Sequence, residues 1–123
     1  YNRGHFRGKR AICSVTTGSP AEAFAPYGRG GNMVHLMWPI HCSLYYVGYD
    51  VLPPQLSCGI QGGGISYRDE SAFQRHLEQT KEAWGTRLAG IEAESPIPFT
   101  GWAGWDEAGI LKHAHPARWR PSP

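Results

Sequence analysis

Residues 11–17 read AICSVTT, and the run ends at the turn-forming sequence Gly18-Ser19-Pro20. A short apolar and β-branched run of this kind predicts a strand that is buried on both faces, as in a parallel sheet. The loop that follows, residues 18–31, is rich in glycine and carries two prolines. Connections of this length are uncommon and are often functional. The sequence therefore places a candidate site directly after its first strand.

Two helices and a second strand follow this loop. Apolar residues at three- and four-residue steps predict a kinked helix over residues 33–47, with Asn32 as its N-cap, Pro39 inside it and Gly48 at its end. Residues 49–52 and 55–60 predict a second strand, broken at two consecutive prolines. Ser66-x-x-Asp69 predicts the start of a helix that runs to about residue 90. The stripe expected on one face of that helix comprises Phe73, His76, Leu77, Thr80, Trp84 and Leu88.

Strands that alternate with helices predict an α/β fold with a parallel sheet. Two strands alone leave an exposed sheet edge and a thin core, so we expect further strands in a missing N-terminal part or in a partner chain. The chain begins at Tyr1 without an initiator methionine, which favours a fragment or a processed piece. We divide it into an α/β segment, residues 1–95, and an irregular tail, residues 96–123, that carries Trp102, Trp105 and Trp119.

Composition and charge exclude several classes of protein. The 123 residues suit one domain, and the net charge of +2 is too small to indicate a nucleic-acid partner. No apolar run approaches the ~20 residues of a transmembrane helix. The three cysteines form no Cys-x-x-Cys pair and predict no disulfide framework, which favours a reducing, cytoplasmic compartment.

The residues that end the first strand form the strongest candidate site: Thr16, Thr17, Gly18 and Ser19. Ligands of open α/β sheets bind outside the carboxyl ends of the strands. Hydroxyl and backbone N–H groups there can hold an electron-rich ring edge or a phosphate, and the missing Cβ of Gly18 would let a planar ligand approach the backbone. An ordinary turn after a strand is the alternative. The sequence contains neither of the common glycine-rich phosphate motifs in its required context.

Other chemistry is weakly indicated. His113 and His115 are two positions apart, but no cysteine or carboxylate stands at a spacing typical of a metal site, so we predict none. Cys13 lies inside the predicted strand and is interpreted as a small core residue rather than a nucleophile. These residues alone identify no catalytic group.

Three motifs resemble one known family. Residues 7–18 read RGKRAICSVTTG and look like the fourth strand of flavodoxin-like NAD(P)H:quinone oxidoreductases, the DT-diaphorase family and its bacterial relatives. Residues 36–40, LMWPI, resemble that family's helix with an internal Trp-Pro-Ile, and residues 48–56, GYDVLPPQL, resemble the strand that follows. The resemblance implies a flavodoxin-like parallel sheet flanked by helices, of which this chain holds only the C-terminal part. The whole chain, residues 1–123, would then be the C-terminal part of one flavodoxin-like domain.

The resemblance also implies an activity. Members of the family use bound FAD to take hydride from NADH or NADPH and pass it to a quinone in the same pocket, with ping-pong kinetics, as obligate homodimers. Thr16, Thr17, Gly18, Ser19 and Phe24 would then border the flavin, and the loop that cradles the FAD phosphates would belong to the missing N-terminal part.

This sequence departs from the family pattern at three positions. Ser19 stands where members often have a second glycine, and Phe24 and Gly30 stand where the animal enzymes have a tyrosine and a histidine that assist charge relay. Neither Phe24 nor Gly30 has a side chain that donates a hydrogen bond. Related bacterial proteins also carry phenylalanine at the first of these positions, which favours a bacterial-type member.

Two alternatives belong to other functional classes. One is an ancillary flavoprotein that regulates a potassium-efflux transporter and uses the same fold as an interaction module. The other is an inactive, truncated product. Transporter binding would separate the first from an enzyme, and flavin content and oligomeric state would separate the second.

Overall fold

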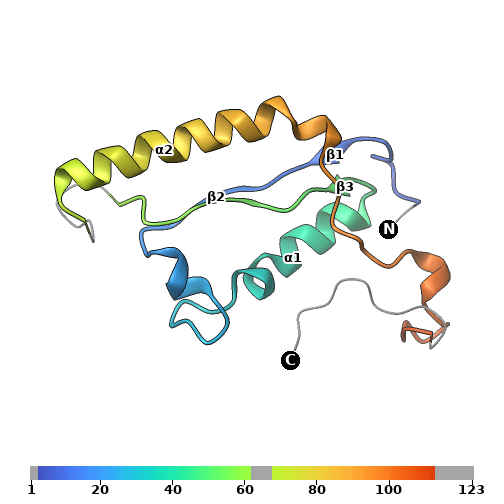
Figure 1. Ribbon diagram of the computed structural model, residues 1–123. Helices are drawn as coiled ribbons and strands as arrows, with labels where there is room; N and C mark the ends of the chain where they lie inside the picture. The colour runs from blue at the N-terminus through green and yellow to red at the C-terminus, as the bar shows by residue number, and fades with distance from the viewer. Residues whose placement is uncertain (1–2, 62–67, 113–123) are drawn as a thin grey trace. The chain divides into compact units, whose positions relative to one another are not determined.

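The computed structural model describes residues 3–61 and 68–112 (Figure 1). Two longer helices are present among these residues, α1 (Met33–Tyr46) and α2 (Glu70–Ala89). Four short strands accompany them: β1 (Arg10–Ala11), β2 (Ser14–Thr16), β3 (Asp50–Val51) and β4 (Gln55–Ser57). Short 3-10 helices complete the order: η1 (Ala21–Phe24), η2 (Ile91–Ala93) and η3 (Trp102–Gly104).

All strand pairing within named strands is parallel. β1 pairs with β3, and β2 pairs with β4 in the register Ser14 to Gln55, Val15 to Leu56 and Thr16 to Ser57. The second predicted strand is interrupted at Pro53 and Pro54, as its two prolines indicated. Proline has no N–H to donate to a ladder, so β3 and β4 are separate strands. The parallel α/β prediction is therefore confirmed.

The expectation of one strand over residues 11–17, buried on both faces, is wrong. The segment contains two short strands, and in β2 Ser14 and Thr16 are exposed while Val15 is half-buried. The polar, apolar, polar order of these three residues is the period-two pattern of a strand with one solvated face. The sequence of residues 14–16 shows this alternation, but the apolar and β-branched residues of the longer run 11–17 suggested burial on both faces.

The chain divides into two compact units. The first is built mainly from β1, α1, β3 and the segment after residue 95. Met37, Val51, Leu52 and Ile97 are buried there, as is His41, which is 1% exposed. The ring of Phe99 stacks on Tyr45, with centroids 4.6 Å apart, and it also contacts Trp38. An aromatic cluster thus joins α1 to the segment that follows residue 95.

The end of α1 follows the sequence closely. Gly48 has a φ of +109°, and its N–H donates to the carbonyl of Tyr45 while Tyr49 N–H donates to the carbonyl of Leu44. This is the left-handed glycine cap expected from the sequence. Pro39 lies inside the helix, and its carbonyl accepts a hydrogen bond of 2.7 Å from the hydroxyl of Ser43.

The second unit contains β2, β4, η1 and α2. Asp69 is the N-cap of α2, and its side chain accepts a 2.9 Å hydrogen bond from the N–H of Ala72. This contact holds the pKa of the Asp69 carboxyl below its usual value, with a further contribution from the Ser71 hydroxyl. Phe73 is buried, but Leu88 at the end of the predicted stripe is 46% exposed. Ser66, the predicted helix start, lies outside the described residues.

The predicted irregular tail has local order over its described part. Asp106 Oδ1 accepts hydrogen bonds from the N–H groups of Ala108 and Ile110, which closes a tight turn. Trp105 and Leu111 form an antiparallel bridge across it. Trp119 lies outside the described residues. Over residues 3–61 and 68–112, no helix is both long enough and apolar enough to cross a membrane.

Candidate functional site

The loops that follow β2 and β4 are joined beyond the ends of the strands. Because the two strands are parallel, their carboxyl ends lie at the same edge of the sheet. Thr17 N–H donates to the carbonyl of Ser57 at 3.0 Å, and Ile60 N–H donates to the carbonyl of Thr17 at 2.9 Å. Gly59 N–H donates to the carbonyl of Ser19 at 2.8 Å. Residues 17–19 and 57–60 therefore form one paired edge, which we call the strand-end site.

Some hydrogen-bonding groups of the candidate residues already have partners within the site, and others do not. The backbone N–H of Thr17 is bonded to Ser57, and its hydroxyl donates to the carbonyl of Ser19 at 2.8 Å. Over residues 3–61 and 68–112, no partner is seen for the N–H groups of Gly18 and Ser19, and Thr16 is exposed. The donors available to a ligand are therefore backbone groups of residues 18 and 19 and the hydroxyls of Thr16 and Ser19.

The role expected for Gly18 needs correction. A Cβ at this position would lie 2.8 Å from Oε1 of Gln61, 3.2 Å from its Cδ and 3.4 Å from its Cβ. The space beside Gly18 is therefore filled by the Gln61 side chain and is not open to a planar ligand in this conformation. Gln61 was missed in the sequence because it stands at the start of a glycine-rich stretch, which gave it the character of an ordinary loop residue.

Two of the three positions that depart from the family pattern, Phe24 and Gly30, lie against each other. A Cβ at Gly30 would lie 2.7 Å from Cε1 of Phe24, and Gly30 N–H donates to the carbonyl of Ala23 at 2.8 Å. The Phe24 ring thus takes the volume that a side chain at residue 30 would need. The N–H of Ala23 donates to the carbonyl of Pro20 at 3.1 Å, which links η1 to the end of the strand-end site.

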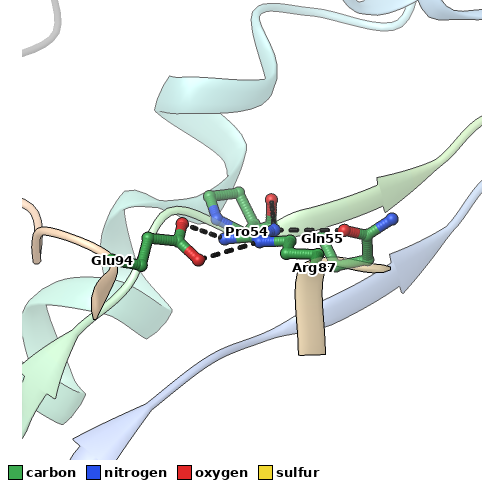
Figure 2. Close-up of polar contacts among 4 residues, drawn as sticks. All are labelled: Pro54, Gln55, Arg87 and Glu94. Carbon is green, nitrogen blue, oxygen red and sulfur yellow. Dashed lines mark hydrogen bonds and ion pairs between the residues drawn. The ribbon is translucent and has the colours of Figure 1, made fainter. Parts of the chain in front are cut away.

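Arg87 fixes the beginning of β4 (Figure 2). One of its guanidinium nitrogens donates to the carbonyl of Pro54 at 3.0 Å and to Oε1 of Gln55 at 3.1 Å. The other two nitrogens form a bidentate ion pair with Glu94 at 3.0 and 2.5 Å. The side chains of Arg87 and Glu94 are only 21% and 25% exposed, so solvent screens this pair less than a surface pair. Arg87 therefore ties the end of α2 to β4.

His76 holds the other end of β4. Its Nε2 lies 2.7 Å from the carbonyl oxygen of Cys58, the residue directly after the strand. Sequence reasoning placed His76 on the packed stripe of α2 and gave it no polar role. The available signal was its distance of eleven residues from Arg87, close to three turns of 3.6 residues, which puts both polar side chains on one helix face.

In the described part of the chain, Cys13 is not activated as a nucleophile and no metal centre is formed. Burial raises the pKa of the Cys13 thiol above its ordinary value, which agrees with a packed residue rather than a reactive thiolate. No group of three or more metal-binding side chains gathers among residues 3–61 and 68–112. His113 and His115 lie outside those ranges. The chemistry that these residues support is the binding and orientation of a ligand.

Comparison with known proteins identifies relatives of the chain. It is 37% identical over 101 residues to the ribosyldihydronicotinamide dehydrogenase [quinone] of Homo sapiens, an alignment that covers 81% of this chain and 40% of the relative. It is 32% identical over 115 residues to NAD(P)H dehydrogenase [quinone] 1 of Cavia porcellus, covering 90% of this chain and 38% of that protein. The chain thus spans about two fifths of the length of the curated relatives it matches.

A solved structure and a family match agree with these relatives. A Klebsiella pneumoniae protein, provisionally assigned as a quinone reductase, superposes with a TM-score of 0.77 at 26% identity and covers 99% of this chain and 45% of that protein. The family described as having a flavodoxin-like fold matches residues 1–88, well over half of the 123 residues. Together with the parallel strands and helices described above, this match shows that the chain belongs to the flavodoxin-like fold family.

Proposed function

We propose that this chain forms part of the active site of a quinone reductase. The proposed reaction is the two-electron reduction of a quinone by NADH or NADPH, with FAD as the cofactor and the two substrates alternating in a ping-pong sequence. The proposed assembly is a cytoplasmic homodimer. Its support is the similarity to quinone dehydrogenases at 32% and 37% identity and the strand-end site of an α/β sheet.

The arrangement of residues 17–19 is the observation that carries the proposal. These residues include the N–H groups of Gly18 and Ser19, for which no partner is seen in the described ranges. Consecutive backbone donors of this kind fit the carbonyl-bearing edge of a flavin ring. Bound FAD supplies the hydride-carrying chemistry. The described residues fit the ring portion of the cofactor, and the phosphates need a binding loop that this sequence does not contain.

The protein groups at this site bind and orient rather than transfer protons. Phe24 and Gly30 have no side-chain donor, so proton relay through these two positions is excluded. The N–H groups of Gly18 and Ser19 would instead stabilise negative charge on a bound ring edge, because donors held in a fixed loop need little reorganisation. Gln61 would rotate from the face of Gly18 or contact the ligand with its amide.

The proposal is tested by flavin titration of the purified chain. We expect added FAD to lose fluorescence on binding, and we expect Thr16→Val and Ser19→Ala to weaken FAD binding by about threefold to tenfold each, the effect of one hydrogen bond. Thr86→Val is the matched control, because Thr86 is an exposed hydroxyl residue on α2. Quinone-dependent oxidation of NADH and NADPH is then measured with the same variants.

The outcomes separate the functional classes. Uptake of FAD with quinone turnover supports the reductase. Uptake of FAD without turnover favours the transporter-regulating flavoprotein. A chain that takes up no FAD favours the inactive, truncated product. A chain in which the two site variants bind FAD as tightly as the Thr86 control does contradicts the proposed role of the strand-end site.

A further inference from the structure

We propose that His76 is a positioning residue of the strand-end site and acts through the carbonyl group of Cys58. The bond from α2 to this carbonyl fixes the loop after β4, and that loop fixes residues 17–19. The consequence for ligand binding rests on the proposed function, whereas the consequence for the loop does not.

The contact between His76 and Cys58 has a defined polarity. A carbonyl oxygen only accepts, so Nε2 of His76 carries the hydrogen in the 2.7 Å bond. Both residues are half-buried, which limits the water available to replace the bond. His76 touches the backbone rather than a side chain, so its effect does not depend on the chemistry of the Cys58 thiol.

The residues around Cys58 transmit this restraint to the candidate site. The carbonyl of Ser57 accepts from Thr17 N–H, and Gly59 and Ile60 donate to the carbonyls of Ser19 and Thr17. Every one of these bonds involves a neighbour of Cys58 within two positions. A shift of the Cys58 carbonyl therefore pulls on each bond that orients residues 17–19.

The helix that carries His76 is capped at its start and attached to the chain directly before β4 near its end. Asp69 caps its first turn through the N–H of Ala72, and Arg87 binds the carbonyl of Pro54 near its last turn. His76 and Arg87 lie on one face of α2. Arg87 contacts the residue directly before β4, and His76 contacts the residue directly after it. This second attachment is what makes the position of His76 precise enough to place a loop.

The expected gain for a ligand is preorganisation. A loop that is already bonded in its binding conformation loses less conformational freedom when a ligand arrives. His76 would raise affinity in this way without contacting the ligand.

The test compares His76→Leu, which has no donor, with His76→Gln, whose amide can donate from a similar reach. Amide hydrogen exchange in the purified chain is followed by NMR at Thr17, Gly59 and Ile60. We expect His76→Leu to lower the protection of these three amides by about tenfold, the effect of one lost hydrogen bond, and His76→Gln to restore most of it. Gln79→Leu is the matched control, because Gln79 is exposed on the same helix.

Each outcome decides the proposal. The N–H of Gln55, which donates to the carbonyl of Cys13, serves as the internal reference. Loss of protection confined to the three site amides, with rescue by His76→Gln, supports positioning. Unchanged protection in His76→Leu overturns it. Equal loss at Gln55 and at the site amides also overturns it, because that pattern indicates a general loss of stability. Failure of the glutamine variant to rescue would show that the donor is not what holds the loop.

Flavin titration of the same variants keeps the two proposals distinguishable. We expect His76→Leu to bind FAD about tenfold more weakly and His76→Gln to bind nearly as well as the unmodified chain. If no variant and not even the unmodified chain binds FAD, the proposed function fails while the exchange result still decides the role of His76. If FAD binds equally to all variants, the positioning role in binding is overturned.

Discussion

Gly59 shows how one backbone position shapes the strand-end site. The residue is buried with a φ of +70°, a left-handed conformation that side chains with a Cβ rarely adopt. A Cβ there would also lie 2.5 Å from Nη1 of Arg68, which would have to move. We predict that Gly59→Ala lowers the free energy of unfolding by about 1–2 kcal/mol, measured by urea denaturation.

Gly85 is the opposite case and serves as its control. It lies inside α2, and a Cβ there would meet no atom within 4 Å. Alanine is the better helix former and restricts the unfolded chain, so Gly85→Ala should raise the free energy of unfolding by about 0.5–1 kcal/mol. Destabilisation by both alanine variants would refute the conformational argument at residue 59.

We predict that His41 makes the free energy of unfolding depend on pH. The ring is 1% exposed, and burial lowers its pKa below the ordinary histidine value because the charged form loses hydration. The unfolded chain therefore binds this proton more readily than the folded chain does. The contribution of neutral His41 to the free energy of unfolding is therefore complete above the ordinary histidine pKa of about 6.5. It falls as the pH drops toward the lowered pKa of His41 in the folded chain.

The measurement is urea unfolding between about pH 8 and pH 5, the range in which histidines titrate. His41→Leu removes the group while keeping an apolar side chain in the core. We expect the slope of stability against pH to become shallower in that variant. The other histidines are shared by both proteins, so an identical slope would contradict the assignment to His41.

At the scale of elements, Arg87 is the contact that couples α2 to β4. We predict that Arg87→Met lowers the free energy of unfolding by about 2–3 kcal/mol, because it leaves Glu94 and the Pro54 carbonyl without their half-buried donor. Lys81→Met is the matched control. The Lys81–Glu78 pair is 61% and 69% exposed, and its loss should change stability very little. Chemical denaturation of both variants tests the difference.

Helix boundaries could be predicted from local chemistry. Gly48 lies two positions after Tyr46, the last residue of α1, and Asp69 and Gly90 flank α2 directly. These caps work through bonds to neighbours within a few positions, so their signal lies in adjacent residues. Pro53 and Pro54 likewise interrupted the second strand where they stand, because a missing N–H has the same effect in any surroundings.

What could not be predicted depends on residues distant in the sequence. Gln61 fills the space at Gly18, and His76 binds the carbonyl of Cys58, eighteen positions earlier. No local pattern names the partner in either contact, although the spacing of His76 and Arg87 places both on one helix face. The exposed faces of Ser14 and Thr16 were misread for the related reason that burial depends on what covers a strand. The assignment of residues 16–19 and 24 to a ligand site stays a prediction, and the sequence did not indicate which of their groups remain available to a ligand.

At the scale of the whole molecule, several large hydrophobic side chains are exposed on the described surface. Large hydrophobic side chains exposed on α1 include Leu36 at 49% and Ile40 at 50%, one helical turn apart. Exposed apolar surface of this kind promotes association. We predict that the chain associates in a concentration-dependent way and binds a hydrophobic dye, and that the double variant Leu36→Lys, Ile40→Lys reduces both effects.

Sedimentation velocity over a range of concentrations measures this association. Ile110→Lys is the control, because Ile110 is a single apolar residue, 64% exposed, in the tail rather than on α1. We expect it to have a smaller effect than the double variant. An equal effect would show that general charge, rather than the α1 surface, governs association.

The parallel registers of the two ladders have a consequence for how the chain is made. Arg10 pairs with Asp50 and Ser14 with Gln55. During synthesis, β1 and β2 therefore cannot pair until about forty further residues have been added. A ribosome adds roughly 5–20 residues per second, so β1 and β2 spend roughly 2–8 s of synthesis with no partner to bond. The backbone hydrogen bonds within α2 join residues a few positions apart, so the helix itself can form without such a delay. Slow translation between these strands would prolong the interval in which their backbone groups can pair with another nascent chain.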